Sequence, residues 1–291
     1  MEKISAIVSV VEGEIELLPR ALSHLEGLVD EIVIIDMTGR SGLGSIAKEF
    51  GARIFPHQRV EFVESVRNFG TQKAKGGWIL VLDPDEEVPE KLSKKIKAIL
   101  KNPTADYYRI PRKNIIFGKW LKHSRWWPDF NIRLFRKGFV SWSEEIHKVP
   151  ITQGVGADLP PKEEFAIIHH NYDSIDDYLV RMNRYTKVQS EGLMKNGYVF
   201  KWQDLIQKPL GEFLSRYFAG EGYKDGLHGL ALSFLQAFSE LTLYIRVWEK
   251  QGFGEKVPSN KELKTEFGKV LKDFKWWMRE KFSWLRFLKL Q

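Results

Sequence analysis

The sequence contains no cysteine among its 291 residues, which excludes disulfide bonds and thiolate metal sites. This absence fits a reducing cytoplasm. No run of about 18 uncharged apolar residues occurs, so we expect no membrane-spanning helix. The first residues, MEKISAIVSV, lack the basic segment and long apolar run of a signal peptide. The sequence therefore predicts a cytoplasmic protein.

The composition is that of a basic globular protein. The hydrophobic fraction of 43% is enough for a sizeable core, and the net charge is +7. A positive balance favours anionic partners, such as phosphate-bearing substrates or lipid headgroups. Several of the ten tryptophans lie in the basic C-terminal third, which favours a membrane surface. Because the basic residues are otherwise scattered, we expect no nucleic-acid partner.

The first hundred residues alternate between strand-like and helix-like segments, which predicts a mostly parallel sheet with helices on both faces. Right-handed crossovers would bring the carboxyl ends of several strands to one edge. Glu12, Asp36 and the pair Asp83 and Asp85 would then line one crevice. The predicted strands are residues 4–11, 31–36, 52–55 and 78–82, and the predicted helices are residues 15–25, 45–50, 61–74 and 89–100.

An acidic turn follows the strand at residues 78–82, within the stretch KGGWILVLDPDEEV. Ligands bind at the carboxyl ends of strands in open α/β sheets. Asp83 and Asp85, separated by Pro84, can share a divalent cation. Hard oxygen ligands suit Mg²⁺ or Mn²⁺, which usually also hold substrate phosphates. The alternative is a solvated acidic turn that begins the next helix.

The pattern changes after residue 100. Strands are predicted at 106–111 and 131–136, around a long loop at 113–130. From Ser174 the sequence is typical of helices, and Asp177 three residues later makes a start like a capping box. The chain ends in a basic, aromatic, amphipathic segment. We therefore predict two regions: residues 1–172 as an α/β domain, and 173–291 as a helical region that associates with a membrane or with a second subunit.

The order of motifs resembles that of a known family. Asp36 is followed by Arg67-Asn68, GGWILVLDPDEE, Asn114, Phe117-Gly118, WWPD (126–129), RLFR (133–136) and Ile146-His147, and later by Asn183-Arg184-Tyr185 and Lys224-Asp225-Gly226. Over residues 4–250 the sequence resembles inverting family 2 glycosyltransferases with the GT-A fold. It is most similar to the lipopolysaccharide core glycosyltransferases of the WaaE/KdtX type.

The resemblance implies transfer of a sugar from a nucleotide-diphosphate sugar to a saccharide or lipid-linked acceptor of the cell envelope. It implies Mg²⁺ or Mn²⁺ at Asp83 and Asp85, with His169 as a third ligand or a phosphate contact. The alternative for His169 is a hydrogen-bonded structural residue. The donor site would be formed by Val10, Glu12, Asp36, Arg67, Asp83, Pro84 and Asp85. The general base would be Glu145, Asp129, Glu144 or His147, and the acceptor contacts would be Trp126, Trp127 and Arg133.

Three segments depart from the family pattern. Glu12-Gly13-Glu14 replaces Asn-Glu-Glu, Arg40 replaces the second aspartate after the second strand, and Ile146-His147-Lys148 replaces Val-His-Glu. Two alternatives stay open. A nucleotidyltransferase would usually carry a Gly-rich basic loop after the first strand, where this chain is acidic. A non-catalytic, membrane-associated scaffold would explain the altered donor loops.

Overall fold

The structure is a computed structural model that describes residues 2–39, 42–60, 64–142 and 150–281. The chain forms two compact units. The first comprises Met1–Asn114 and Pro128–Asn171, and the second comprises Ile115–Trp127 and Tyr172–Gln291. Residues 115–127 thus belong with the C-terminal helices. The division of roles predicted for residues 1–172 and 173–291 stays a prediction.

The first unit is built on a mixed sheet whose parallel half is the one predicted. The parallel strands occur in the order β3-β2-β1-β4, so β1 pairs with both β2 and β4. These strands are β1 (Ile4–Val10), β2 (Glu31–Asp36), β3 (Arg53–Pro56) and β4 (Trp78–Leu82). All residues of β1 and β4 are buried, as expected for central parallel strands.

Further strands extend this sheet beyond β4. The order continues β8-β6-β12-β5, with β8 antiparallel to β4 and to β6. A separate two-stranded sheet joins β9 to β10. The bounds are β5 (Glu86–Glu87), β6 (Tyr107–Ile116), β7 (Lys119–Trp120), β8 (Asp129–Arg136), β9 (Val140–Ser141), β10 (Ile151–Thr152), β11 (Gly156–Asp158) and β12 (Ile167–Tyr172).

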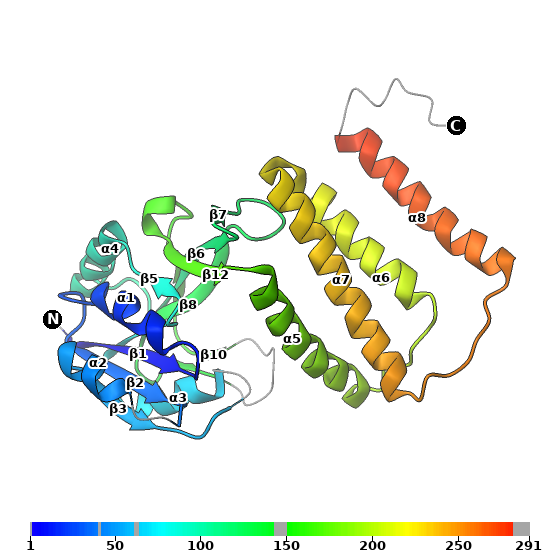
Figure 1. The fold of residues 1–291 in the computed structure, drawn as a ribbon. Helices are drawn as coiled ribbons and strands as arrows, with labels where there is room; N and C mark the ends of the chain where they lie inside the picture. Colours follow the sequence, from blue (N-terminus) through cyan, green and yellow to red (C-terminus); the bar gives the residue numbers. More distant parts are fainter. Residues whose placement is uncertain (1, 40–41, 61–63, 143–149, 282–291) are drawn as a thin grey trace. The chain divides into compact units, whose positions relative to one another are not determined.

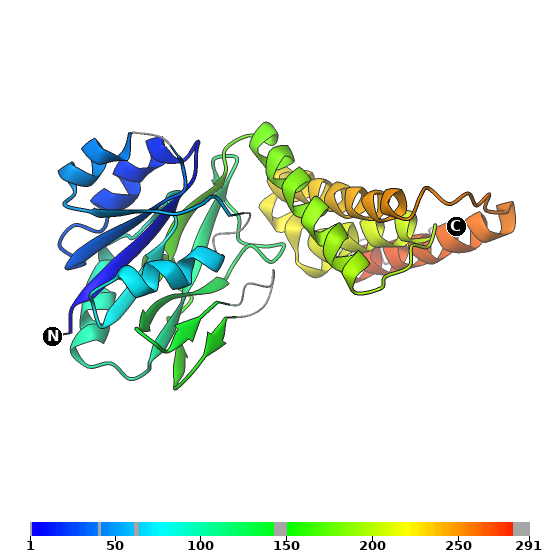
Figure 2. The ribbon, with the colours of Figure 1, turned by 90° about the horizontal axis from the view of Figure 1, so that it is seen from below.

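Helices cover both faces of the sheet, as the sequence predicted (Figures 1 and 2). Alternate residues of β1 face opposite sides: Ala6 and Val8 pack with α1, α2 and α4, whereas Ile7 packs with α3. The helices are α1 (Leu18–Ser23), α2 (Leu43–Glu49), α3 (Glu64–Lys73) and α4 (Glu90–Lys101), with short turns η1 (Ile15–Leu17) and η2 (Glu163–Phe165).

The loop predicted at residues 113–130 is shorter than expected. Strand β6 continues to Ile116 and β8 begins at Asp129, because these strands pair with each other near Arg112 and Asp129. After Ile116 the chain reverses at Phe117-Gly118, where both φ angles are positive, and β7 returns along β6. Positive φ at both central residues is the geometry of a two-residue hairpin turn.

The second unit is helical. Its elements are α5 (Ile175–Lys195), α6 (Asp204–Leu214), η3 (Ser215–Ala219), η4 (Gly222–Asp225), α7 (Leu227–Lys250) and α8 (Asn260–Lys281). The Ser174 hydroxyl accepts the Asp177 N–H at 3.1 Å, which confirms the predicted start of α5. Helix α7 packs against both α5 and α6.

Helix α7 is also the one described helix that is long and apolar enough to cross a membrane. Its mean hydropathy reaches 1.2, and 28% of that segment is buried. Length and composition alone do not distinguish a spanning helix from a packed one. The prediction that the chain has no spanning helix therefore stays a prediction.

Candidate active site

The site lies where β4 ends. Strand β4 delivers Asp83 to its carboxyl end, and the chain turns through Pro84 and Asp85 into β5. The turn is closed by the Glu86 N–H, which donates to the Asp83 carbonyl at 3.0 Å. In return the Glu86 side chain accepts the Asp83 N–H at 3.1 Å. These two bonds fix the acidic turn.

Two arginines contact the carboxylates of this turn. Arg133, from β8, is only 2% exposed, and its Nη2 lies 2.6 Å from Asp83 and 2.5 Å from Glu86. Arg67, from α3, donates to Asp83 at 3.3 Å. Burial raises the pKa of Asp83, but the charges of Arg133 and Arg67 outweigh it and hold the pKa well below its usual range. Asp83 is thus ionised and fixed in position.

Glu86 is the most buried member of the cluster. Its side chain has no exposed surface, and burial raises its pKa even though Arg133 and Arg112 oppose this. The Arg112 Nη1 lies 3.4 Å from Glu86. Glu86 therefore contacts both Arg133 and Arg112, and the sequence did not single it out as a site residue.

Asp129 is engaged by several donors. Its carboxylate accepts from Arg112 at 2.9 Å, from Asn114 at 3.1 Å and from Asn131 at 3.1 Å. Burial raises the pKa of Asp129, but the Arg112 charge and the hydrogen bonds from Asn114 and Arg112 lower it overall. A carboxylate stabilised in its ionised form is a weaker base. Its predicted role as general base stays a prediction, and the contacts favour a structural role.

His169 lies beside Asp85. The imidazole is 7% exposed, its Nδ1 lies 2.6 Å from the Asn114 amide oxygen, and its Nε2 lies 3.6 Å from Asp85 Oδ2. Because an amide oxygen only accepts, this arrangement places a proton on Nδ1 and directs Nε2 toward Asp85. The neighbouring His170 instead contacts Glu87 at 2.8 Å. The two histidines of β12 thus point to different carboxylates.

Asp85 and His169 fit a divalent cation. Two atoms that are each about 2.1 Å from one cation lie at most about 4.2 Å apart, which accommodates their 3.6 Å spacing. The Asn114 contact also resembles the outer hydrogen bonds that orient ligating histidines. Across the described part of the chain, no group of three His, Asp or Glu side chains is arranged to hold a metal. Further ligands would therefore come from substrate phosphates or water.

The predicted donor-side residues lie at adjacent strand ends. Val10 is paired with Asp36 in the parallel register, and Asp36 accepts from the Thr38 N–H at 2.8 Å and its hydroxyl at 2.7 Å. Glu12 is exposed just beyond β1. The structure therefore gathers Val10, Glu12 and Asp36 at one edge, as predicted, whereas Arg40 lies outside the described residues.

Three of the four candidate bases, Glu144, Glu145 and His147, also lie outside the described residues. Trp142, the residue before this segment, is held by two hydrogen bonds to its backbone. The Asn68 side chain donates to the Trp142 carbonyl at 2.7 Å and accepts the Trp142 N–H at 2.9 Å. The Trp142 ring lies 5.6 Å from the Arg67 guanidinium. Trp142, the last described residue before this segment, thus lies beside Arg67, which contacts Asp83.

The predicted acceptor residues separate into two groups. Trp126 and Trp127 belong to the second unit, where Trp126 contacts Tyr172 edge-on and Trp127 contacts Trp120 at 5.2 Å. Arg133 instead lies inside the first unit, with its guanidinium on the carboxylate cluster. The acceptor role of all three stays a prediction.

A family model described as glycosyl transferase family 2 matches residues 5–151. The chain belongs to this family. The match includes the acidic turn, Asp129 and Arg133, whereas His169 lies beyond it. The family 2 assignment makes the chain a glycosyltransferase, and the mixed sheet agrees with the GT-A class that the sequence predicted.

This family 2 glycosyltransferase is similar to several bacterial proteins. An uncharacterized glycosyltransferase of Rickettsia felis is 25% identical over 248 residues, which are 82% of this chain and 87% of that protein. The lipopolysaccharide core biosynthesis glycosyltransferase LpsC of Rhizobium meliloti is 21% identical over 206 residues, or 68% and 75% of the two chains. Among solved structures, S. aureus TarS 1-349 in complex with UDP is 14% identical, with a TM-score of 0.45 and 88% and 94% coverage.

Proposed function

We propose that this family 2 glycosyltransferase transfers a sugar, with inversion, from a nucleotide-diphosphate sugar to a saccharide or lipid-linked acceptor of the cell envelope. The observation that carries the proposal is the acidic turn after β4, where Asp83 is fixed by two arginines and Asp85 faces His169. The likeness to LpsC supports an envelope acceptor.

Asp85 and His169 would hold Mg²⁺ or Mn²⁺. When bound, such a cation neutralises charge that develops on the leaving diphosphate. Asn114 keeps the His169 ring oriented. Asp83, Arg67 and the strand-end residues Val10, Glu12 and Asp36 would hold the nucleotide, and the fixed arginine–Asp83 contacts would keep that pocket in place before the donor arrives.

We propose Glu145 as the general base that removes the proton from the acceptor hydroxyl. Asp129 is the competing candidate, but Arg112 and Asn114 already hold its carboxylate and lower its pKa. Removing a base typically lowers turnover about 10²–10⁴-fold. We expect Glu145→Gln to show such a loss with unchanged donor affinity. An equal loss in Asp129→Asn, with Glu145→Gln near wild type, would reverse the assignment.

The reaction class can be tested without knowing the acceptor. Full-length protein is incubated with UDP- and GDP-sugars and Mn²⁺, and release of nucleoside diphosphate is followed. We expect slow hydrolysis of at least one donor, abolished by Asp85→Asn. Release of pyrophosphate from a nucleoside triphosphate would instead identify a nucleotidyltransferase, and no turnover of any donor would favour the non-catalytic scaffold.

We further propose that the enzyme works in the cytoplasm, peripherally on the inner face of the cell membrane. The basic balance and the tryptophans of the C-terminal region support this location. A homodimer formed through the same helices is the competing arrangement. From the membrane surface, the enzyme would reach lipid-linked acceptors.

A further inference from the structure

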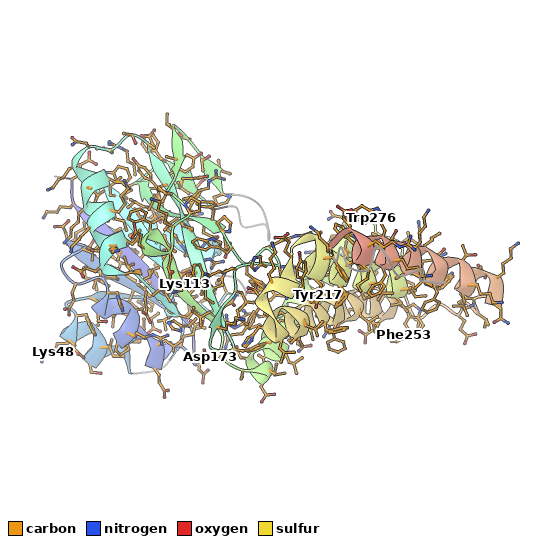
Figure 3. All side chains as sticks on the ribbon, turned by 90° about the horizontal axis from the view of Figure 1, so that it is seen from above. Lys48, Lys113, Asp173, Tyr217, Phe253 and Trp276 are labelled. Carbon is orange, nitrogen blue, oxygen red and sulfur yellow. The ribbon has the colours of Figure 1, made fainter. Side chains whose placement is uncertain are left out.

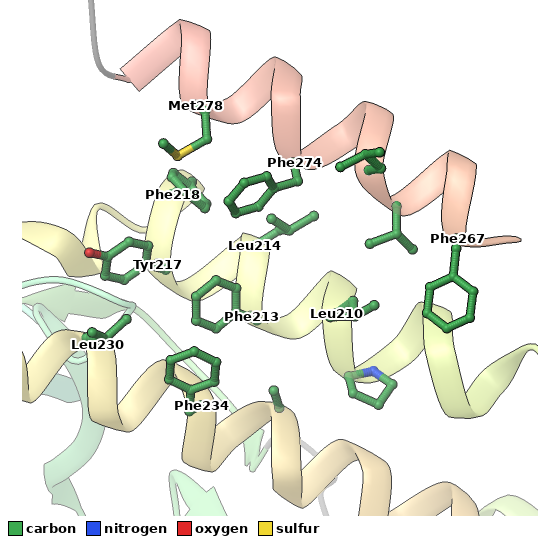
Figure 4. Close-up of a pocket in the computed structure, with 14 residues that line it drawn as sticks. Leu210, Phe213, Leu214, Tyr217, Phe218, Leu230, Phe234, Phe267, Phe274 and Met278 are labelled. Carbon is green, nitrogen blue, oxygen red and sulfur yellow. The ribbon is translucent and has the colours of Figure 1, made fainter. Parts of the chain in front are cut away.

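The helical unit contains a groove between α6, α7 and α8. Its volume is about 720 Å³, and its lining is almost entirely apolar. Figure 4 shows side chains from all three helices converging on it. Among the residues that line it are Leu210 and Phe213 of α6, Phe218 of η3, Phe234 of α7, and Phe267 and Phe274 of α8.

The groove is open rather than packed. Phe234 is 58% exposed, Phe267 55% and Leu271 52%. The same surface continues along α7, where Phe238 and Ile245 follow Phe234 on one helical face and are also exposed. Within the described ranges, all the large exposed apolar side chains except Ile151 and Val155 belong to this unit. A concentrated apolar surface of this kind marks an interaction site.

The helix that forms one wall of the groove is basic. Helix α8 carries seven Lys and Arg residues and four acidic ones. Two of its acids are already paired, Glu262 with Lys256 and Glu266 with Lys269. Trp276, also on α8, is 56% exposed (Figure 3). Lysines on a helix with an exposed apolar face are typical of a helix that lies in an anionic headgroup layer.

The charge distribution favours a bilayer over a second copy of the chain. A two-fold contact through this groove would place the same patch of both copies face to face, so each basic α8 would approach a like-charged surface. Opposed like charges disfavour such a contact. An anionic bilayer offers both complements, acyl chains for the groove and phosphates for the lysines.

We propose that this surface docks on an anionic phospholipid bilayer, with acyl chains in the groove and the basic residues of α8 among the headgroups. The proposal concerns where the enzyme is held and does not depend on which donor or base it uses. It goes beyond peripheral association, because it assigns the contact to particular side chains.

The test is sedimentation of the full-length protein with vesicles of phosphatidylcholine alone or with phosphatidylglycerol. We expect binding only to the anionic vesicles, weakened at high salt because the headgroup attraction is screened. Leu271→Gln and Phe267→Gln should each lower the partition coefficient about tenfold, since each removes an apolar side chain from the contact. Lys272→Glu should weaken binding about fivefold or more.

Val199→Gln is the matched control. Val199 is 68% exposed in the same unit but does not line the groove, so this variant should bind like wild type. All substituted residues are exposed, and unchanged thermal unfolding checks that they fold. A second readout needs no groove variant: brominated lipids in anionic vesicles should quench the tryptophan fluorescence of the wild-type protein.

Absence of binding to the anionic vesicles would overturn the proposal, as would equal binding by wild type and Leu271→Gln. Light scattering that shows a dimer, converted to a monomer by Leu271→Gln, would make a second copy the occupant instead. Nucleotide binding by the same variants should stay at the wild-type level. A failure of docking is therefore distinguishable from a failure of the proposed transferase function.

Discussion

Replacing Arg133 by methionine tests the charge network below the acidic turn. Arg133 is 2% exposed and contacts both Asp83 and Glu86. Removing one partner of a buried ion pair typically costs about 3–5 kcal/mol. Methionine retains much of the apolar stem, and Arg112 and Arg67 still face the carboxylates. We therefore expect the free energy of unfolding to fall by about 3 kcal/mol, near the lower end of this range.

The loss of stability in Arg133→Met should depend on pH. In the folded wild type the pKa of Asp83 lies below its unfolded value of 3.8, because Arg133 and Arg67 outweigh the effect of burial. A group with a depressed folded pKa adds stability above the unfolded value, and this stability is lost as the pH falls through the folded pKa. Arg133→Met removes much of this contribution and eases protonation of Asp83 and Glu86. The loss of stability should be largest near pH 7. It should shrink toward pH 4 through Glu86, because burial already raises the pKa of Glu86 and removing Arg133 raises it further, whereas Asp83 adds its share only below its unfolded value of 3.8.

Native-state hydrogen exchange of the β4 amides is the assay, because it reports on the first unit directly. Arg136→Met is the matched control: Arg136 lies on the same strand, is 32% exposed and pairs with Glu2 and Asp106 at the surface. Exposed pairs contribute about 0–1 kcal/mol. A deficit for Arg133→Met no larger than that of Arg136→Met, or one that is the same at pH 7 and pH 4, would refute the reasoning.

Three further perturbations address the surroundings of the site. Asn68→Ala removes both hydrogen bonds to the Trp142 backbone and should cost about 1–3 kcal/mol in the urea unfolding of the first unit; an unchanged midpoint would contradict this. Asp225→Ala removes the carboxylate that accepts the His123 N–H at 2.9 Å and so anchors the backbone next to Lys122. Trypsin should therefore cleave after Lys122 faster, while donor binding is retained. Unchanged cleavage would argue against this anchoring role. Asn114→Ala should weaken Mn²⁺-dependent donor binding about 10–100-fold by freeing the His169 ring, and an effect of equal size without metal would show a general loss of structure instead.

The parallel half of the fold was predictable because its signals are local. The alternation of apolar strands and helical segments, and the position of Asp83 and Asp85 at a strand end, depend on short stretches of sequence. The Ser174 cap is likewise local. The structure confirms these features, and it shows Trp78–Leu82 buried at the centre of the sheet.

The contacts among Glu86, Arg112, Asp129 and Arg133 were not predictable in the same way. They depend on the register of antiparallel strands that are far apart in the sequence, and a shift by one residue would turn each side chain to the other face. The family resemblance implied that Arg133 is an acceptor contact, but nothing in the sequence predicted that the pairing of β8 with β4 and β6 buries it on the carboxylate cluster. A buried carboxylate such as Glu86 gives no sequence signal beyond its place after the acidic turn.

The central claim is that the acidic turn binds the donor diphosphate together with a divalent cation. It is tested most directly by calorimetric titration of UDP and GDP into the full-length protein, with and without Mn²⁺. We predict binding of at least one nucleotide that requires Mn²⁺ and is lost in both Asp85→Asn and His169→Ala, with the fold retained. Failure of both nucleotides to bind with Mn²⁺, or binding that is equal without Mn²⁺ and unaffected by Asp85→Asn, would contradict the claim.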